Sequence, residues 1–360
     1  MKGRRMRLRD SIGAELRFLL LVNPQQRPWQ IPLLAALAVG LPLLTAAWLG
    51  HFGFGITTCL GALVILYMPQ GRTMRRGIST LAACGCGFVL CFALGAGTSF
   101  NPWISALTLG ITAALATALC RLWALPPPGT FFFIMITALG STAAFAPELI
   151  PLRLGLVALG SLTACLLALA YNLCQMRGSP TTSVPITLPA QGVRQIVGEA
   201  VIVGVFVGGS YAVARWLGLD NPYWVPISCA AIMQGASLRL LWQRKIHRIL
   251  GTGLGMLLAW GIFSLSLSHL QIALVVMALQ FVIEVLVVRN YGLAMVFITP
   301  LTVLFADAAG PIHDVEALIL ARMFDILLGS VIGFFGGWAC HGYRRRIAPV
   351  RPPLADAGQR

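Results

Sequence analysis

A few charged side chains lie inside long apolar stretches, and their types and spacing are the first indication of chemistry. Arg322 and Asp325 are three residues apart within the apolar stretch 317–341, a spacing that places both on one face of a helix. A lone charge inside a membrane is costly, whereas two opposite charges together are tolerated. Two interpretations follow: a structural ion pair, or a cation that attracts an anionic ligand while Asp325 tunes its charge.

Three further arginines are candidates for binding the same kind of ligand. Arg153 stands in the first half of the chain at a position that matches Arg322, but without the aspartate. Arg244 and Arg248 belong to a short basic stretch, 239–248, between two apolar segments. We expect this stretch to form the cytoplasmic turn of a helical hairpin, with both arginines at the mouth of an anion path.

Two aromatic residues and two carboxylates complete the candidates. Tyr223 and Trp224 open an apolar segment, where aromatic residues by default form the interfacial belt; the alternative is stacking on an aromatic ligand. Glu284 lies one turn from the cytoplasmic end of its predicted helix, either as a proton-coupling residue or as a side chain that extends to the interface. Glu199 begins its helix, where the helix dipole favours a carboxylate, and we predict no ligand role for it.

The composition is that of a membrane protein. The chain has 360 residues, 58% hydrophobic and 10% charged, with a mean hydropathy of +0.84. Soluble domains carry roughly 25% charged residues, and no soluble core could bury this many apolar side chains. The net charge of +15 would suggest nucleic-acid binding in a soluble chain, but the cytoplasmic loops of a membrane protein account for it. We therefore expect the lipid bilayer, and no nucleic acid, as a partner.

Twelve apolar segments predict an all-α bundle that crosses the membrane about twelve times. Residues 1–30 precede them as a basic amphipathic helix on the cytoplasmic surface, and residues 342–360 follow as a cytoplasmic tail. With the N-terminus inside, all but three of the 26 Lys and Arg residues fall on the cytoplasmic side, which places both termini there. The segments are, in chain order, 31–49, 54–68, 78–97, 103–122, 131–146, 152–174, 196–217, 223–240, 249–267, 270–288, 291–306 and 317–341.

The segments divide into two groups of six, 31–174 and 196–341, joined by a proline-containing cytoplasmic linker, 175–195. Rows of small residues recur between the groups at nearly constant offsets, and such rows let membrane helices approach closely. Because each group has an even number of helices, the repeats would be parallel. The glycines that we expect to face other helices rather than lipid are Gly251, Gly255, Gly329 and Gly333.

Motifs of enzymes and metal sites are missing from the sequence. The nine cysteines lie almost entirely inside apolar runs, without metal-binding spacing, and we interpret them as small buried residues. No HExxH or GxSxG motif is present. The glycine-rich run 251–255 lies in a membrane span with no preceding strand, so it is not a nucleotide loop. We predict no enzyme, no metal and no other cofactor.

The hairpin region carries residues of a known family. It resembles the hallmark of the fusaric acid resistance (FUSC) family, also called the aromatic acid exporter family, through Tyr223-Trp224 and Gln243-Arg244-Lys245-Ile246-His247-Arg248-Ile249-Leu250-Gly251-Thr252-Gly253-x-Gly255. Two later motifs resemble the same family: Arg289-Asn290-Tyr291 and Arg322-x-x-Asp325-x-x-x-Gly329. The resemblance covers residues 200–341, with 31–174 as a weaker copy.

The resemblance implies a bacterial inner-membrane protein that exports aromatic or other organic acid anions, driven by the proton gradient. Plant malate channels resemble this family too, with subunits paired around a cationic pore, and here the two halves would form that pair; a homo-oligomer stays open. Many members carry a cytoplasmic domain between the halves, and this short linker has none, so a periplasmic adaptor does not carry over. The alternatives are a passive organic-anion channel, or a non-transporting protein of membrane assembly or envelope stress.

Overall fold

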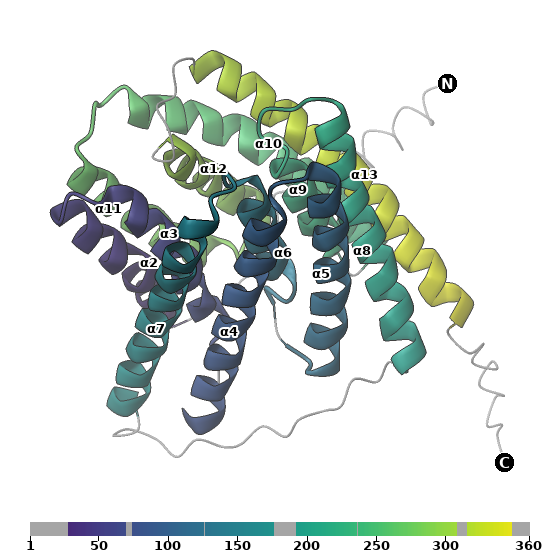
Figure 1. The fold of residues 1–360 in the computed structure, drawn as a ribbon, viewed down its shortest axis with the longest axis horizontal. Helices are drawn as coiled ribbons and strands as arrows, with labels where there is room; N and C mark the ends of the chain where they lie inside the picture. Colours follow the sequence, from purple (N-terminus) through teal and green to yellow (C-terminus); the bar gives the residue numbers. More distant parts are fainter. Residues whose placement is uncertain are drawn as a thin grey trace, which may run out of the picture.

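The protein is a bundle of α-helices in every part that the structure, a computed structural model, describes (Figure 1). The described residues are 28–69, 74–125, 127–175, 192–235, 237–307 and 315–347. The helices are α2 (Gln30–Trp48), α3 (Phe52–Ala62), η1 (Leu63–Tyr67), α4 (Met74–Thr98), α5 (Pro102–Leu122), α6 (Phe131–Thr142), η2 (Pro147–Leu149), α7 (Ile150–Gln175), α8 (Val193–Trp216), α9 (Trp224–Met233), α10 (Leu238–Phe263), α11 (His269–Leu286), α12 (Tyr291–Asp307) and α13 (Val315–Ile347).

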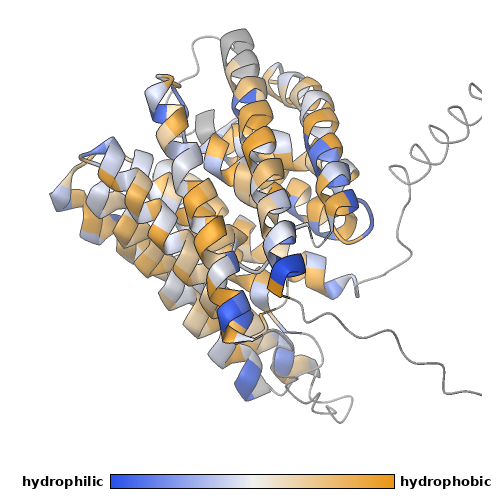
Figure 2. Ribbon diagram, turned by 90° about the vertical axis from the view of Figure 1, so that its right-hand side faces the viewer, coloured by the Kyte–Doolittle hydropathy of each residue, from blue (hydrophilic) through white to orange (hydrophobic). Residues whose placement is uncertain are grey.

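The all-α membrane architecture predicted from the composition is confirmed. Eight helices in the described ranges are long and apolar enough to cross a membrane, and four apolar helical segments, formed by α3 with η1, α6, α9 and α12, are shorter. Figure 2 shows hydrophobic residues along most of each helix, with hydrophilic residues in short patches. Residues 1–27 of the predicted amphipathic segment 1–30 and most of the linker 175–195 lie outside the described residues.

The basic stretch 239–248 is helical, so the prediction that it forms the hairpin turn was wrong. The chain leaves α9 at Met233, and α10 begins at Leu238 because Ser237 Oγ accepts a hydrogen bond from Leu240 N at 3.3 Å. Arginine and lysine are good helix formers, and no glycine or proline interrupts the stretch. For the same reason α13 runs through three arginines to Ile347, beyond its predicted end at 341, where cations also suit the helix C-terminus.

Two helices at corresponding places in the two halves end in the same way. Gly50 follows α2 with a φ of 76°, and Gly218 follows α8 with a φ of 68°. This left-handed conformation is disfavoured for residues with a Cβ, which explains why the Leu-Gly pair recurs at both helix ends. In each case the residue after the glycine donates to a carbonyl one turn earlier, His51 N to Ala46 O at 2.8 Å and Leu219 N to Ala214 O at 3.1 Å.

The helices of the two halves pack on one another. Within the first half α4 packs along α6 and α3 along α7; within the second half α10 packs along α12 and α9 along α13. Across the halves α5 packs along α8 and α11 along α2. The helices α5 and α11, which pack against the other half, both begin with N-terminal caps. Asn101 accepts hydrogen bonds from two backbone amides of α5, and Ser268 with Gln271 forms a capping box on α11.

The four glycines predicted to face other helices lie against α12 and α9. A Cβ built on Gly251 would lie 2.7 Å from Gly292 O, and one on Gly255 would lie 2.7 Å from Val296 O, both on α12. Gly329 and Gly333 lie against backbone carbonyls of α9 in the same way. The α10–α12 and α9–α13 contacts therefore depend on the absence of a Cβ at these four glycines, because backbone approaches this close leave no room for a methyl group.

We expect Gly255→Leu to destabilise the protein by about 1–3 kcal/mol, because the added side chain overpacks the α10–α12 contact. Gly253→Leu is a matched control, since a Cβ at Gly253 would meet no atom within 4 Å. The measurement is denaturant unfolding of the purified protein in detergent. Equal stabilities of the two variants would show that the α10–α12 contact does not limit the size of this residue.

A buried carboxylate joins three helices through hydrogen-bonded ion pairs. Glu199 of α8 is 0% exposed and accepts from Arg344 of α13, Nε to Oε1 at 2.8 Å and Nη2 to Oε2 at 2.6 Å. Arg121 of α5 pairs with the same carboxylate, and Gln195 Nε2 donates to it at 3.0 Å. The sequence interpretation of Glu199 as a simple helix-dipole carboxylate was therefore wrong, because α8 already begins at Val193 and the arginine partners of Glu199 are distant in the chain.

We expect the double variant Arg121→Ala/Arg344→Ala to lose about 3–5 kcal/mol of stability, because it leaves a buried carboxylate without its cations. Glu199→Gln should cost less, since both arginines are partly exposed and can reach water. Adding Glu199→Gln to the double variant should restore part of the loss. Unfolding midpoints of the three variants test this, and a double variant as stable as wild type would contradict it.

Candidate functional site

Arg322 is a buried cation inside the bundle. It lies on α13 with 5% of its surface exposed, and its Cζ sits 3.7 Å from the centroid of the Trp224 ring of α9. Its Nη2 donates a hydrogen bond to Thr302 Oγ1 of α12. The indole face and the hydroxyl partly replace the water that this guanidinium has lost.

A second buried arginine lies one turn away along α9. Arg248 of α10 is 5% exposed and donates from Nη2 to Ser228 Oγ at 3.1 Å and from Nη1 to Tyr291 OH at 3.2 Å. Ser228 follows Trp224 by four residues, so Arg248 and Arg322 approach the same side of α9. The prediction that Arg248 lies at an open mouth was wrong, because helical α10 carries the residue inward.

Arg244 continues this set toward the turn between α9 and α10. Its Nη1 donates to Ala231 O and to Gln234 Oε1, each at 3.3 Å, and its Cζ lies 5.6 Å from the centroid of the Tyr291 ring. Tyr291 thus contacts both Arg244 and Arg248. We name Arg244, Arg248 and Arg322 the arginine column, since they follow one another between α9, α10, α12 and α13.

Several buried polar atoms around the arginine column have no hydrogen-bond partner among the described residues. The described ranges contain six such side-chain atoms, and all but Gln30 Oε1 belong to α10 or α13. Unpaired buried polar atoms are rare in proteins and cost free energy unless water or a ligand meets them. The unpaired atoms of the second half are Arg248 Nε, Thr252 Oγ1, Arg322 Nε, Asp325 Oδ2 and Ser330 Oγ.

Asp325 is buried without forming the ion pair that one interpretation of the sequence gave it. It lies three residues from Arg322 and is 1% exposed, yet the ion pairs identified among the described residues join Glu199 to Arg121 and Arg344 and do not include Asp325. The position still places a carboxylate close to Arg322, one turn before Gly329, which abuts α9. Asp325 thus lies beside Arg322 without occupying the donors of its guanidinium.

The remaining predicted site residues lie in different surroundings. Trp224 is 8% exposed and packed in the core, so its interpretation as a belt residue facing lipid headgroups was wrong; Tyr223 lies beside it, 4.9 Å between ring centroids. Arg153 starts α7 and donates to Ala144 O at 3.0 Å in an exposed contact, away from α9, α10, α12 and α13. Glu284 is buried on α11, where Gln280 Nε2 donates to it at 3.5 Å.

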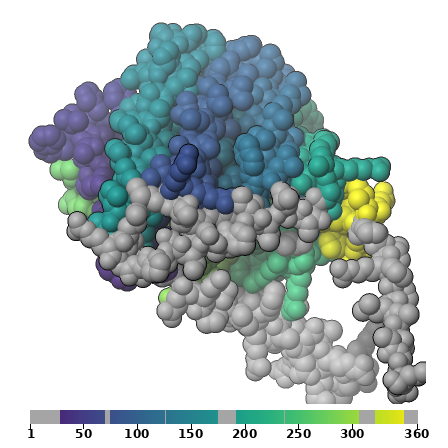
Figure 3. All heavy atoms as spheres, turned by 90° about the horizontal axis from the view of Figure 1, so that it is seen from below, coloured from purple at the N-terminus to yellow at the C-terminus, as the bar shows by residue number. Residues whose placement is uncertain are grey.

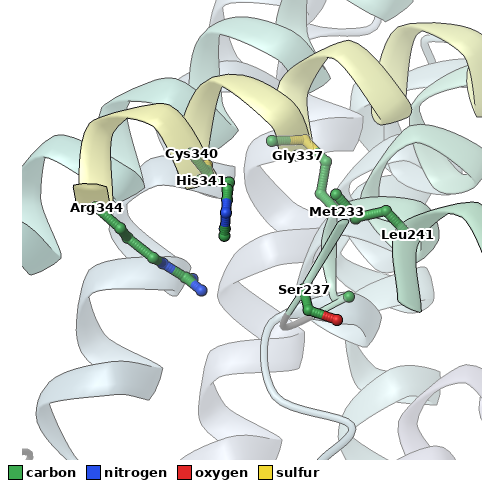
Figure 4. A pocket seen from close by; sticks show the side chains of 8 residues that line it. Met233, Ser237, Leu241, Gly337, Cys340, His341 and Arg344 are labelled. Carbon is green, nitrogen blue, oxygen red and sulfur yellow. The ribbon is translucent and has the colours of Figure 1, made fainter. Parts of the chain in front are cut away.

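A small cavity near the ends of α9 and α13 is too small for a ligand. Figure 4 shows His341 and Arg344 of α13 on one side, and Met233, Ser237 and Leu241 of the α9–α10 hairpin on the other. Its volume of about 10 Å³ matches a single water molecule. We therefore assign no substrate to this cavity, and the arginine column is the candidate site.

The sequence did not identify four polar residues that contact or surround the arginine column. Tyr291 stood within a family motif, but nothing in that motif indicated that it contacts two arginines. Ser228 follows Trp224 by one helical turn, and Thr252 follows Arg248 by one turn, a spacing that a search around each buried charge could have found. Thr302 carries no such signal, because its contact with Arg322 depends on how α12 meets α13.

Comparisons with known proteins cover the part of the chain that carries this site. Residues 209–336, which contain Trp224, Arg248 and Arg322, match the family described as fusaric acid resistance protein-like. Over 158 residues, 43% of this chain, the sequence is 34% identical to the uncharacterized membrane protein YvaC of Bacillus subtilis (strain 168), and it spans 25% of that relative's length. No solved structure matches. The resemblance predicted from the hairpin motif is therefore confirmed: residues 209–336 of this membrane protein are similar to the fusaric acid resistance protein-like family.

Proposed function

We propose that the protein transports organic acid anions across the membrane along the arginine column. The observation that carries the proposal is the group of unpaired polar atoms on α10 and α13, beside two arginines that are each 5% exposed. An anion that enters an apolar region alone loses its hydration at a large cost in free energy. Buried guanidinium groups with unused donors offset that cost, since they bind carboxylates through charge-assisted hydrogen bonds.

Three cations at different depths would pass the anion from one to the next. Arg244 lies next to the turn between α9 and α10, and Arg248 and Arg322 follow deeper in the bundle. Four residues of α9 separate the contacts of Arg248 and Arg322, which is roughly 6 Å along the helix axis. Trp224 beside Arg322 suits an aromatic acid, and Asp325 keeps the guanidinium from binding the anion too tightly to release it.

The architecture that we propose for this transporter has twelve spans in two parallel six-helix repeats. Each half has its shorter apolar helices at the second and fifth places, α3 and α6 in the first half, α9 and α12 in the second. Reciprocal packing supports a pseudo-two-fold axis, because the fourth helix of each half, α5 or α11, packs along the first helix of the other, α8 or α2. The positive charges favour a bacterial inner membrane with both termini cytoplasmic.

Coupling to protons is the finer part of the proposal, and Glu284 is its candidate residue. This carboxylate is 5% exposed on α11, which packs along α2 and α12. A buried carboxylate that gains and loses a proton during transport would link export to the proton gradient. A passive channel would need no such residue, so Glu284→Gln should abolish flux driven by a pH gradient only if transport is coupled.

We expect Arg322→Ala to lower anion flux at least tenfold, because it removes the deepest cation, while Arg322→Lys retains part of the flux. Arg248→Ala should mainly weaken anion binding. Arg153→Ala is the matched control, since this arginine of the other half makes an exposed contact. The measurement is uptake of benzoate and a panel of other carboxylates into proteoliposomes at equal protein content.

Two results would contradict the proposal. If Arg322→Ala is folded and transports at the wild-type rate, then Arg322 serves packing against Trp224 and not transport. If the wild-type protein moves none of the carboxylates, the non-transporting alternative is favoured. Unfolding curves for each variant separate loss of transport from loss of structure.

A further inference from the structure

A groove of about 600 Å³ lies between α4 and α5, in the half of the chain that does not carry the arginine column. Phe133 of α6 and small residues such as Ala83, Gly87 and Ala116 line it, with leucines of both helices along its sides. In Figure 1 the lower ends of α4 and α5 diverge, and α6 lies behind them. The volume falls in the range of roughly 300–1,000 Å³ typical of ligand sites.

The groove opens toward the bilayer. Leucines that line it are also among the most exposed apolar residues of the protein: Leu90 is 64% exposed, Leu115 58% and Leu119 44%. These side chains belong to α4 and α5, two helices long and apolar enough to span the membrane. Figure 3, a view from the side at which α4 begins and α5 ends, shows both helices at the surface. A molecule in the groove would therefore enter sideways from the lipid phase.

The two halves differ at this place, and the difference creates the groove. In the second half, Gly251 and Gly255 of α10 are buried against α12. Ser79 and Ala83 stand at the matching positions of α4, and both are exposed and line the groove. The first half thus leaves uncovered a helix face that the second half covers with protein.

One end of the groove is cationic. Arg76 lines it in the first turn of α4, near Trp123 and Leu125 at the end of α5. The hydroxyls of Ser79 and Thr80 donate to the backbone carbonyl of Arg76, at 3.1 and 2.8 Å. No side chain in the described ranges pairs with the Arg76 guanidinium. None of the described side chains therefore neutralises its charge, which can bind an anion at the membrane surface, where lipid phosphates lie.

We propose that this groove binds an anionic phospholipid, with the phosphate on Arg76 and one acyl chain between α4 and α5. The lining residues from Arg76 to Leu90 extend about 21 Å along α4. This exceeds the roughly 15 Å that half of the hydrocarbon core measures, so one acyl chain fits along its length. The second acyl chain stays in the bilayer, beside the exposed leucines. This binding is independent of anion transport.

The test is native mass spectrometry of the full chain, purified in detergent and mixed with phosphatidylglycerol or phosphatidylcholine. Ala83→Trp fills the groove and should lower retention of phosphatidylglycerol at least fivefold. Ala82→Trp is the matched control, because this neighbouring residue is also exposed but does not line the groove. Equal retention by the two variants would overturn the proposal.

A second pair of variants tests the charge. Arg76→Gln should remove the preference for phosphatidylglycerol over phosphatidylcholine, whereas Arg75→Gln, an exposed residue that does not line the groove, should keep it. An unchanged preference in Arg76→Gln would overturn the assignment of the phosphate to Arg76. Displacement of the phospholipid by an equal concentration of palmitate would identify a free long-chain carboxylate as the ligand and overturn the phospholipid assignment.

Discussion

Hydrocarbon offers a charged or polar group no hydrogen bond, so each such group inside this bundle depends on the partners that the fold supplies. The structure meets this constraint in two different ways. At Glu199 every carboxylate oxygen is met, by Arg121, Arg344 and Gln195, and the result holds α5, α8 and α13 together. Around Arg248 and Arg322 the donors are only partly used. The first arrangement suits a fixed structural contact, whereas the second suits a site at which another molecule completes the hydrogen bonds.

Close helix approach is what brings the arginine column together. The α9–α13 contact requires Gly329 and Gly333, and the α10–α12 contact requires Gly251 and Gly255. Since Arg322 of α13 reaches Trp224 of α9 across the first of these contacts, Gly329 and Gly333 help to determine the geometry of the site. A family motif that combines arginines with glycines can therefore be explained physically. The glycines let the helices approach closely, and cations on different helices can share a ligand only where those helices meet.

Much of the fold follows from the sequence, because hydrophobic periodicity and capping are local. The apolar segments and the glycines at close helix contacts, Gly251, Gly255, Gly329 and Gly333, were predictable. The pairing of Glu199 was not, since its arginine partners lie 78 and 145 residues away. The position of α10 was mispredicted because charge was taken as a sign of a loop, whereas arginine and lysine continue a helix well. Burial of Trp224 depends on how α9 meets α13, which no local pattern reports.

The two halves share a helix order but use it differently. In the second half, α12 covers the small residues of α10, and the polar atoms that remain are enclosed with two arginines. In the first half, the matching face of α4 stays open to the bilayer, with Arg76 at one end and leucines along the sides. The same order of helices thus encloses polar atoms in one half and leaves an apolar groove in the other. Because enclosed cations favour a dehydrated anion and an open apolar groove favours an amphiphile, the difference at this helix face would separate the transport path that we propose from the lipid site that we propose.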